Sequence, residues 1–290
     1  MSSLTQFLFE ERDARDLAAM RIALGLVLIV WWVALWPDLG FLLSSEGPVD
    51  LQLLREKWSG YRFGPFDSLT IGQLQVVHLL GFGAVISFTV GWFTRWMNLV
   101  ILFFLAAYWH RSPWIQNGGD RLLRIWVLYM CFAPSGRAWS VDAWRGRGAS
   151  TAPVFATRLI QLQLIVMYTF TGIAKSGRTW HEGSALYYSF SDLGYVRFPE
   201  FFDRVLIYRP VRAALAVGSW LALIWELGFG PLVIWARSRS LALWFGVLLH
   251  LIIFATLAVG IFSWASLWGY LAFLPQGWAE RLRRRLWRMA

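Results

Sequence analysis

The chain holds little of what soluble proteins use for charge and cross-linking. Its 290 residues include only two lysines, Lys57 and Lys175, and one cysteine, Cys131. A single cysteine excludes an intramolecular disulfide and leaves the redox compartment open. Charged residues make up 15% of the chain, whereas soluble domains hold roughly 25%. The familiar nucleophile, zinc and phosphate-loop motifs are missing, and no histidine spacing fits a metal site, so we predict no bound metal.

Apolar residues take the place of the missing charges. They make up 58% of the chain, and many of the 20 tryptophans stand near the ends of apolar runs, as they do at membrane interfaces. Since a helix needs about 20 residues to cross a bilayer core, the sequence predicts an all-α, polytopic integral membrane helical bundle with about eight transmembrane helices. We expect one domain, residues 1–290. The expected spans are 17–36, 71–92, 96–110, 121–133, 155–175, 212–235, 241–257 and 259–274, of which the third, fourth and last two are short.

Arginine placement predicts the orientation. The net charge of +10 resides in scattered arginines, which suits a membrane topology and not a nucleic-acid-binding module. Their enrichment in short connections and in the tail puts both termini in the cytoplasm. In the tail, Trp278, Leu282 and Leu286 recur at helical spacing among arginines, which predicts a helix lying on anionic lipids of the inner leaflet. Simple retention of positive charge inside the cell explains the tail equally well.

Lys175 ends the apolar run 155–174 and is the first functional candidate. A charged ammonium near hydrocarbon is costly, and lysine tolerates such a place by losing its proton, which arginine does not do. A neutral amine is suited to act as a general base. The alternative is a lysine whose stem extends to the lipid headgroups and which stays charged.

Other polar side chains gather, in this topology, near the extracytoplasmic membrane face. Asn117, Gly118 and Gly119 break the helix there, and Asp120 is suited to cap the next one. Each group also has a purely structural explanation. A histidine can hydrogen-bond a neighbouring helix, an arginine at a helix start can extend to the headgroups, and an aspartate can cap a helix. The supporting candidates for the site are His78, His110, Asp120, Arg121, His181 and Glu182.

Glu226 and His250 fall near the middle of their predicted spans, too deep to reach the headgroups. Ionisable groups at that depth need partners. We expect a hydrogen bond between Glu226 and His250 that locks two helices together. A proton path through the two residues is the sharper alternative.

Two segments carry a family resemblance. Residues 117–142 read NGGDRLLRIWVLYMCFAPSGRAWSVD, and residues 168–190 read YTFTGIAKSGRTWHEGSALYYSF. They resemble the HTTM family, the transmembrane domain shared with vitamin K-dependent gamma-glutamyl carboxylase. Arg21, Gly25, Glu226 and His250 agree with the pattern too, so the resemblance covers essentially the whole chain.

The resemblance implies a reaction at Lys175. In the carboxylase the matching lysine acts as base on reduced vitamin K, so Lys175 is expected to deprotonate a hydroquinone such as reduced vitamin K or menaquinol. The anion reacts with oxygen, a quinone epoxide is produced and a strong base forms. In the full carboxylase that base removes a glutamate γ-proton, and carbon dioxide adds to the carbanion. A quinol, with oxygen and carbon dioxide as co-substrates, is therefore implied.

The chain departs from the carboxylase in one respect. The carboxylase continues into a large lumenal domain that helps hold its protein substrate, whereas this sequence ends at Ala290. We expect no such domain, and hence a small lipophilic substrate in place of a protein, in a multi-pass protein of the bacterial inner membrane. Two alternatives stay open. One is a non-enzymatic partner-binding, maturation or immunity protein whose partner is unknown, and the other is a small-solute or proton transporter using Glu226 and His250.

Overall fold

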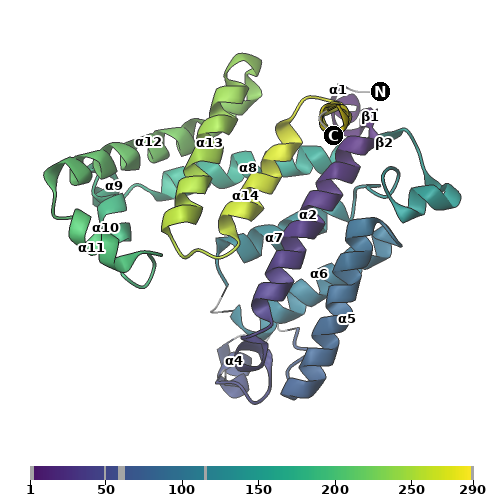
Figure 1. Ribbon diagram of the computed structural model, residues 1–290, viewed down its shortest axis with the longest axis horizontal. Helices are drawn as coiled ribbons and strands as arrows, with labels where there is room; N and C mark the ends of the chain where they lie inside the picture. The colour runs from purple at the N-terminus through teal and green to yellow at the C-terminus, as the bar shows by residue number, and fades with distance from the viewer. Residues whose placement is uncertain (1–2, 49, 58–62, 114–115, 289–290) are drawn as a thin grey trace. The chain divides into compact units, whose positions relative to one another are not determined.

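The computed structural model describes residues 3–48, 50–57, 63–113 and 116–288 and is mostly helical (Figure 1). The predicted all-α class is confirmed apart from one short antiparallel pair of strands. The chain packs as two compact units, residues 1–159 with 274–290, and residues 160–273. That residues 1–290 form a single domain stays a prediction.

The first unit contains the N-terminal helices, the strand pair and the C-terminal helix. Within it α2 packs against α5, and α5 against α6. Its elements are α1 (Ser3–Phe9), β1 (Glu11–Asp13), α2 (Ala14–Leu35), α3 (Leu39–Leu43), α4 (Leu51–Lys57), α5 (Ile71–Val90), α6 (Thr94–Arg111), α7 (Gly118–Met130), η2 (Ala143–Arg147), β2 (Thr151–Pro153) and α15 (Trp278–Trp287).

The second unit is built on a hairpin of two long helices, α12 and α13, with α14 against α13. Helix α8 begins in the first unit and runs mostly through the second. The elements are α8 (Phe155–Ala174), α9 (Arg178–His181), α10 (Ala185–Ser191), α11 (Pro199–Val205), α12 (Arg209–Ile234), α13 (Ala236–Thr256), α14 (Phe262–Tyr270) and η3 (Leu271–Phe273).

Four helices of the described chain are long and apolar enough to cross a membrane: α2, α5, α12 and α13. They match the first, second, sixth and seventh predicted spans. Of the other predicted spans, the fourth corresponds to α7, with 13 residues, and the eighth to α14, with 9. At 1.5 Å per residue α14 covers roughly 14 Å, about half of a bilayer core. Eight complete crossings are not confirmed, and four is the number that length and composition support.

A buried arginine organises one end of the first unit. Arg21 of α2 is fully buried. Its guanidinium donates hydrogen bonds to the carbonyls of Ser135 and Trp139, both at 2.5 Å. Asp142, a few residues on, caps α6 by accepting the Thr94 N–H at 2.9 Å. The connection after α7 is therefore held to α2 through Arg21 and to the start of α6 through Asp142. The Arg21 contact is costly to break, because a buried guanidinium needs its acceptors.

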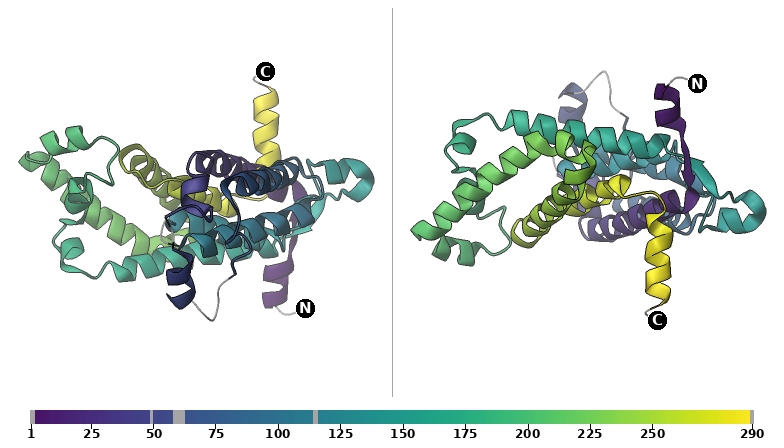
Figure 2. Two further views of the ribbon diagram at one scale, coloured as in Figure 1. Left: turned by 90° about the horizontal axis from the view of Figure 1, so that it is seen from below. Right: turned by 90° about the horizontal axis from the view of Figure 1, so that it is seen from above.

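The C-terminal helix α15 runs across the end of α2 and not along it (Figures 1 and 2). Its apolar positions Trp278, Leu282 and Leu286 alternate with arginines over the residues that the sequence pattern indicated. The prediction of an amphipathic tail helix is therefore confirmed, while its contact with lipid stays a prediction.

Candidate functional site

Lys175 follows the last turn of α8, and its side-chain nitrogen donates a hydrogen bond to the Glu226 carboxylate of α12. The Lys175 side chain is 20% exposed and that of Glu226 is 13% exposed. Lys175 Nζ also lies 5.1 Å from the centre of the Trp180 ring, within the range of cation–π attraction. The amine therefore has both a carboxylate and an aromatic ring beside it.

A close helix contact sets up this pair. A Cβ on Gly172 would lie 2.9 Å from a Leu227 side-chain carbon and 3.1 Å from the Leu227 backbone nitrogen. Glycine therefore allows α8 and α12 to touch through their backbones one turn before Lys175. Leu227 directly follows Glu226, so this contact brings the lysine and the glutamate to one level. The sequence had placed Lys175 at the outer end of its span and Glu226 at mid-span.

The segment after Lys175 is fastened to α12 as well. Trp220 Nε1 donates to the His181 carbonyl at 3.0 Å, and the Leu186 N–H donates to Ser219 Oγ at 3.1 Å. Gly183 between them has φ +77°, and a Cβ there would meet Trp220 at 3.0 Å. These hydrogen bonds hold α9, which carries Trp180, near the Lys175 amine.

A second polar group in this unit is a hydrogen-bonded chain of Tyr168, His250 and Tyr270. Tyr168 stands two turns before Lys175 on α8, which puts both on one side of that helix. Its hydroxyl lies 2.7 Å from His250 Nε2 and 2.7 Å from the Tyr270 hydroxyl. All three residues are buried. The second unit therefore holds a buried chain of three side chains that carry exchangeable protons.

Gly246 makes room for this chain. A Cβ on Gly246 would come within 3 Å of the Tyr270 and Trp225 rings, so glycine is required where α13 passes α14 and α12. His250 Nδ1 has no hydrogen-bond partner in the part of the chain that the structure describes. One ring nitrogen of His250 is thus engaged, and the other is buried without a protein acceptor.

The expected Glu226–His250 hydrogen bond is wrong. Glu226 pairs with Lys175, and His250 bonds to Tyr168. A cation directly after α8 is a stronger partner for a carboxylate than a neutral imidazole, and the sequence could not show that α8 reaches α12 at this level. The two tyrosines were missed as site residues because buried tyrosines in apolar helices resemble ordinary core aromatics. The position of Tyr168, on the same helix face as Lys175, is the signal that could have found it.

His181 and Glu182, both supporting candidates from the sequence, are exposed on and just after α9. Glu182 accepts a hydrogen bond from Arg178 at 2.5 Å, which is a local helical ion pair of small energetic value. The described hydrogen bonds of His181 are made by its backbone N–H and carbonyl groups. Neither side chain has a described contact with Lys175.

The remaining supporting candidates belong to the first unit. His78 Nδ1 lies 3.0 Å from the Tyr108 hydroxyl, and His78 Nε2 lies 3.1 Å from the Trp32 carbonyl. These two contacts join α5 to α6 and α2. His78 is 1% exposed, and both of its ring nitrogens therefore have protein partners in place of water. His78 thus makes the hydrogen bonds to neighbouring helices that its structural explanation requires.

Asp120 takes part in a cap but is not itself the capping residue. Asn117 precedes α7 and accepts the N–H groups of Gly119 and Asp120, while the Asp120 carboxylate accepts the Asn117 N–H at 2.9 Å. This is a capping box, with Asp120 in the reciprocal position three residues on. Asp120 also accepts the Trp31 indole N–H at 2.7 Å, which ties α7 to α2. The sequence suggested Asp120 as the cap, whereas Asn117 occupies the cap position and Asp120 the third position of the helix. Both residue types are favourable caps, so the sequence did not distinguish them.

His110 and Arg121 complete the supporting candidates of the first unit. His110 Nδ1 accepts the Phe63 N–H at 3.3 Å, and Arg121 is exposed. Among the described residues, no three histidine, cysteine or acidic side chains are grouped as metal ligands would be. A cavity of about 570 Å³ in the first unit is lined by Cys131, Asp142 and several arginines, and no predicted site residue lines it.

Residues 9–278 match the model of the HTTM domain, which is the domain found in vitamin K-dependent carboxylase. The chain belongs to the HTTM family. No solved structure matches it. The resemblance drawn from the sequence is confirmed, and together with the four apolar helices it identifies this HTTM chain as a membrane protein.

The two segments that carried the resemblance have distinct structural roles in this HTTM chain. Residues 117–142 form α7 and the connection that Arg21 and Asp142 tie down. Residues 168–190 contain both Tyr168 and Lys175, and thus supply one member to each polar group of the second unit.

Proposed function

We propose that this HTTM protein is a membrane enzyme in which Lys175 removes a proton from a lipophilic hydroquinone. The observation that carries the proposal is the contact between Lys175 and Glu226, an amine beside a largely buried carboxylate. The family relation to vitamin K-dependent carboxylase adds support, since the resemblance assigns the base to this lysine.

The contact between Lys175 and Glu226 favours the product of such a proton transfer, in which Lys175 is an ammonium. A hydroquinone hydroxyl gives its proton to neutral Lys175 Nζ, which leaves a hydroquinone anion and an ammonium. The Glu226 carboxylate and the Trp180 ring both face that ammonium. Interactions that strengthen as charge develops lower the barrier, whereas those equal before and after do not. Glu226 and Trp180 therefore act as stabilisers of the protonated base.

The proton must leave Lys175 before the next turnover. An imidazole has an ordinary pKa near neutral pH, and His250 is hydrogen-bonded in one chain with the hydroxyls of Tyr168 and Tyr270. We assign this chain the task of positioning and relaying protons in the second unit. Its burial fits this task, because buried hydrogen bonds hold their geometry without competing water.

A lipophilic substrate fits the surroundings of the pair. Phe170, Ile173 and Ile224 are exposed on α8 and α12. In a membrane these side chains face hydrocarbon, so a quinol dissolved in the bilayer reaches Lys175 without a soluble docking domain. Overall, hydroquinone and oxygen give quinone epoxide and water. Carbon dioxide enters only if the strong base formed with the epoxide deprotonates a carbon acid, and a protein acceptor is not part of the proposal.

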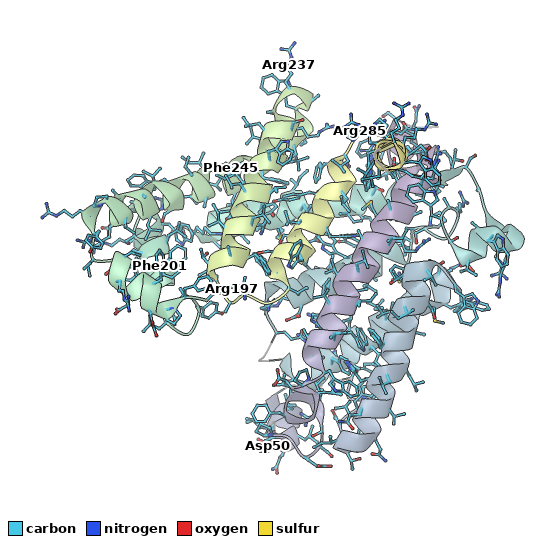
Figure 3. The ribbon with its side chains drawn as sticks, in the orientation of Figure 1. Asp50, Arg197, Phe201, Arg237, Phe245 and Arg285 are labelled. Carbon is cyan, nitrogen blue, oxygen red and sulfur yellow. The ribbon has the colours of Figure 1, made fainter. Side chains whose placement is uncertain are left out.

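The proposal includes the orientation, with both termini in the cytoplasm of a bacterium and the lysine reached from the other side. Arg237, from a connection expected in the cytoplasm, and Arg197, from a connection expected outside, lie at opposite ends of α13 (Figure 3). Arg197 donates to the Phe254 carbonyl at 2.7 Å and so closes the end of α13. Labelling of single cysteines introduced at Ser238 and Ser191 with an impermeant reagent tests this orientation, and labelling of both from the same side contradicts it.

The decisive experiment is oxygen-dependent formation of quinone epoxide by purified protein in lipid. Reduced vitamin K or menaquinol is supplied with ¹⁸O₂, and the epoxide is measured by mass spectrometry. Wild type is expected to produce labelled epoxide, and Lys175→Ala and Lys175→Arg to produce none, because arginine does not become a neutral base.

A matched pair of carboxylate variants sharpens the result. Glu226→Gln is expected to lower turnover at least tenfold, while Glu200→Gln, at an exposed glutamate that pairs with the exposed Arg204, is expected to leave it unchanged. Unchanged turnover in Lys175→Arg removes Lys175 as the base. Folded wild type that makes no epoxide turns attention to the partner-binding and transport alternatives, of which proton or solute flux in liposomes tests the second.

A further inference from the structure

The C-terminal helix α15 is fixed to α2 by partly buried hydrogen bonds and an ion pair. The Asp16 carboxylate accepts the Gly277 N–H at 2.7 Å and the Ala279 N–H at 3.1 Å. Glu280 is nearly buried and pairs with Arg15 of the α2 first turn at 3.1 Å. Gly277 has φ +71°, which lets the chain turn sharply into α15. The helix therefore has a defined position on α2 and is not a loose tail.

An apolar groove lies between α15 and α2. Its volume is about 500 Å³, in the range of roughly 300–1,000 Å³ typical of small-molecule sites. Arg283 is the single charged residue in its lining. The apolar lining consists chiefly of Ala19, Ile22, Trp139, Trp278, Leu282 and Leu286.

An open basic cavity, formed by exposed side chains of α15 and the residue after it, adjoins this groove. It has a volume of about 270 Å³ and is lined by Arg283, Arg284, Trp287 and Arg288. Arg283 lines both spaces, so an apolar compartment and a cationic compartment meet at one side chain. The carboxylate of Glu280 offsets part of this charge, since it accepts hydrogen bonds from Arg283 and Arg284 at 2.9 Å. Arg288 has no acidic partner among the described residues.

We propose that these two spaces together bind one anionic membrane phospholipid. Its acyl chain lies in the groove, and its phosphate lies among Arg283, Arg284 and Arg288. An apolar space that meets a cationic space is complementary to a phospholipid, in which the charged headgroup directly adjoins the hydrocarbon chains. The direction of α15 across the end of α2 fits as well, because a helix in that direction lies in the interface when α2 crosses the membrane. This site is independent of the chemistry proposed at Lys175.

The test is a titration of full-length protein in detergent, followed by native mass spectrometry. The probes are dioleoyl phosphatidylglycerol, dioleoyl phosphatidylcholine and inorganic phosphate. One phosphatidylglycerol is expected to bind at least tenfold more tightly than phosphatidylcholine, and phosphate alone is expected not to be retained. Equal binding of the two lipids, or binding of phosphate as strong as that of phosphatidylglycerol, overturns the proposal.

Two arginines on the same helix provide the matched control. Arg288→Gln removes a charge that lines the basic cavity, whereas Arg285→Gln removes the same charge from a residue that lines neither space. Arg288→Gln is expected to raise the dissociation constant for phosphatidylglycerol at least fivefold, and Arg285→Gln less than twofold. Equal weakening by both variants means that α15 attracts anionic surfaces in general and has no built site.

The groove is tested by filling it. Ala19→Phe places a ring in the groove, and Ala34→Phe places one on an exposed position of the same helix α2. Ala19→Phe is expected to abolish retention of the lipid, and Ala34→Phe to leave it intact. Leu282→Gln makes the groove wall polar without adding volume and is expected to weaken binding at least threefold, so the proposal stays testable if Ala19→Phe does not fold. Undiminished binding in Leu282→Gln overturns the acyl-chain assignment.

Discussion

The Tyr168 hydroxyl lies 2.7 Å from His250 Nε2 and thereby joins α8 to α13. The same hydroxyl lies 2.7 Å from that of Tyr270, the last residue of α14. One buried phenol thus links three helices of the second unit. A hydroxyl that serves two buried neighbours is costly to remove, because both neighbours lose a partner that water does not replace.

Tyr168→Phe tests this cost. The substitution keeps the ring and removes only the hydroxyl, and we expect the free energy of unfolding to fall by about 1–3 kcal/mol. Denaturant unfolding of the purified protein in detergent measures the change. Tyr188→Phe is the matched control, since Tyr188 is 59% exposed, and it is expected to change stability by less than ~0.5 kcal/mol. A loss of equal size in both variants contradicts the assigned role of the Tyr168 hydroxyl.

The sequence was a good guide to single helices and a poor guide to which helices meet. Apolar runs predicted α2, α5, α12 and α13, and the spacing of Trp278, Leu282 and Leu286 predicted α15. These features depend on local periodicity alone. The partner of Glu226 depends instead on where α8 touches α12, and the small Gly172 that permits this contact gives no signal of its destination.

Caps show the same limit at the scale of one turn. Asn117 and Asp120 are both favourable at a helix start, and only the backbone shows that Asn117 occupies the cap and Asp120 the third position. Lys175 stood out in the sequence for its rarity and place. The residues that define its surroundings did not, since Trp180 and Tyr168 are unremarkable members of an aromatic-rich chain.

The Lys175–Glu226 pair is expected to contribute to stability as well as to chemistry. Glu226→Gln leaves Lys175 without its carboxylate, and we expect a loss of about 1–3 kcal/mol in the free energy of unfolding. This is less than the 3–5 kcal/mol typical of fully buried pairs, because both side chains keep some exposure. In the double variant with Lys175→Met, stability is expected to recover in part while epoxide formation stays lost. Strictly additive losses in this double-mutant cycle contradict a direct pairing.

Gly172→Ala tests the helix contact that sets up the pair. Alanine favours a helix over glycine by about 1 kcal/mol, yet the new Cβ meets Leu227 at 2.9 Å. We expect the strain to exceed the helical gain and to lower stability by about 1–2 kcal/mol net. Gly228→Ala on α12 is the comparison, since its Cβ makes only an ordinary contact of 3.4 Å. Stabilisation by Gly172→Ala equal to that by Gly228→Ala shows that the two helices do not need the glycine.

Asp142 is expected to make the stability of the first unit depend on acid. Burial alone raises the pKa of Asp142, but hydrogen bonds from Thr94 and Phe93 outweigh burial and lower the pKa below its ordinary value of 3.8. A carboxyl whose pKa is lower in the folded state contributes stability that is fully present above the unfolded value and is lost as the pH falls through the folded value. Unfolding free energy should therefore decline below about pH 4 in wild type.

Asp142→Asn removes this titration and is the variant in which to measure it. Its unfolding free energy is expected to be lower at pH 7, by about 1 kcal/mol, because an amide has one acceptor oxygen where the carboxylate uses two, and to decline less steeply between pH 5 and pH 3. Asp203→Asn, at an exposed aspartate on α11, is expected to keep the wild-type slope. An unchanged slope in Asp142→Asn shows that other carboxyls carry the acid sensitivity. A slope reduced only in Asp142→Asn identifies the cap of α6 as the acid-labile contact, because Asp142 is the group whose ionised form accepts the Thr94 N–H and hydroxyl.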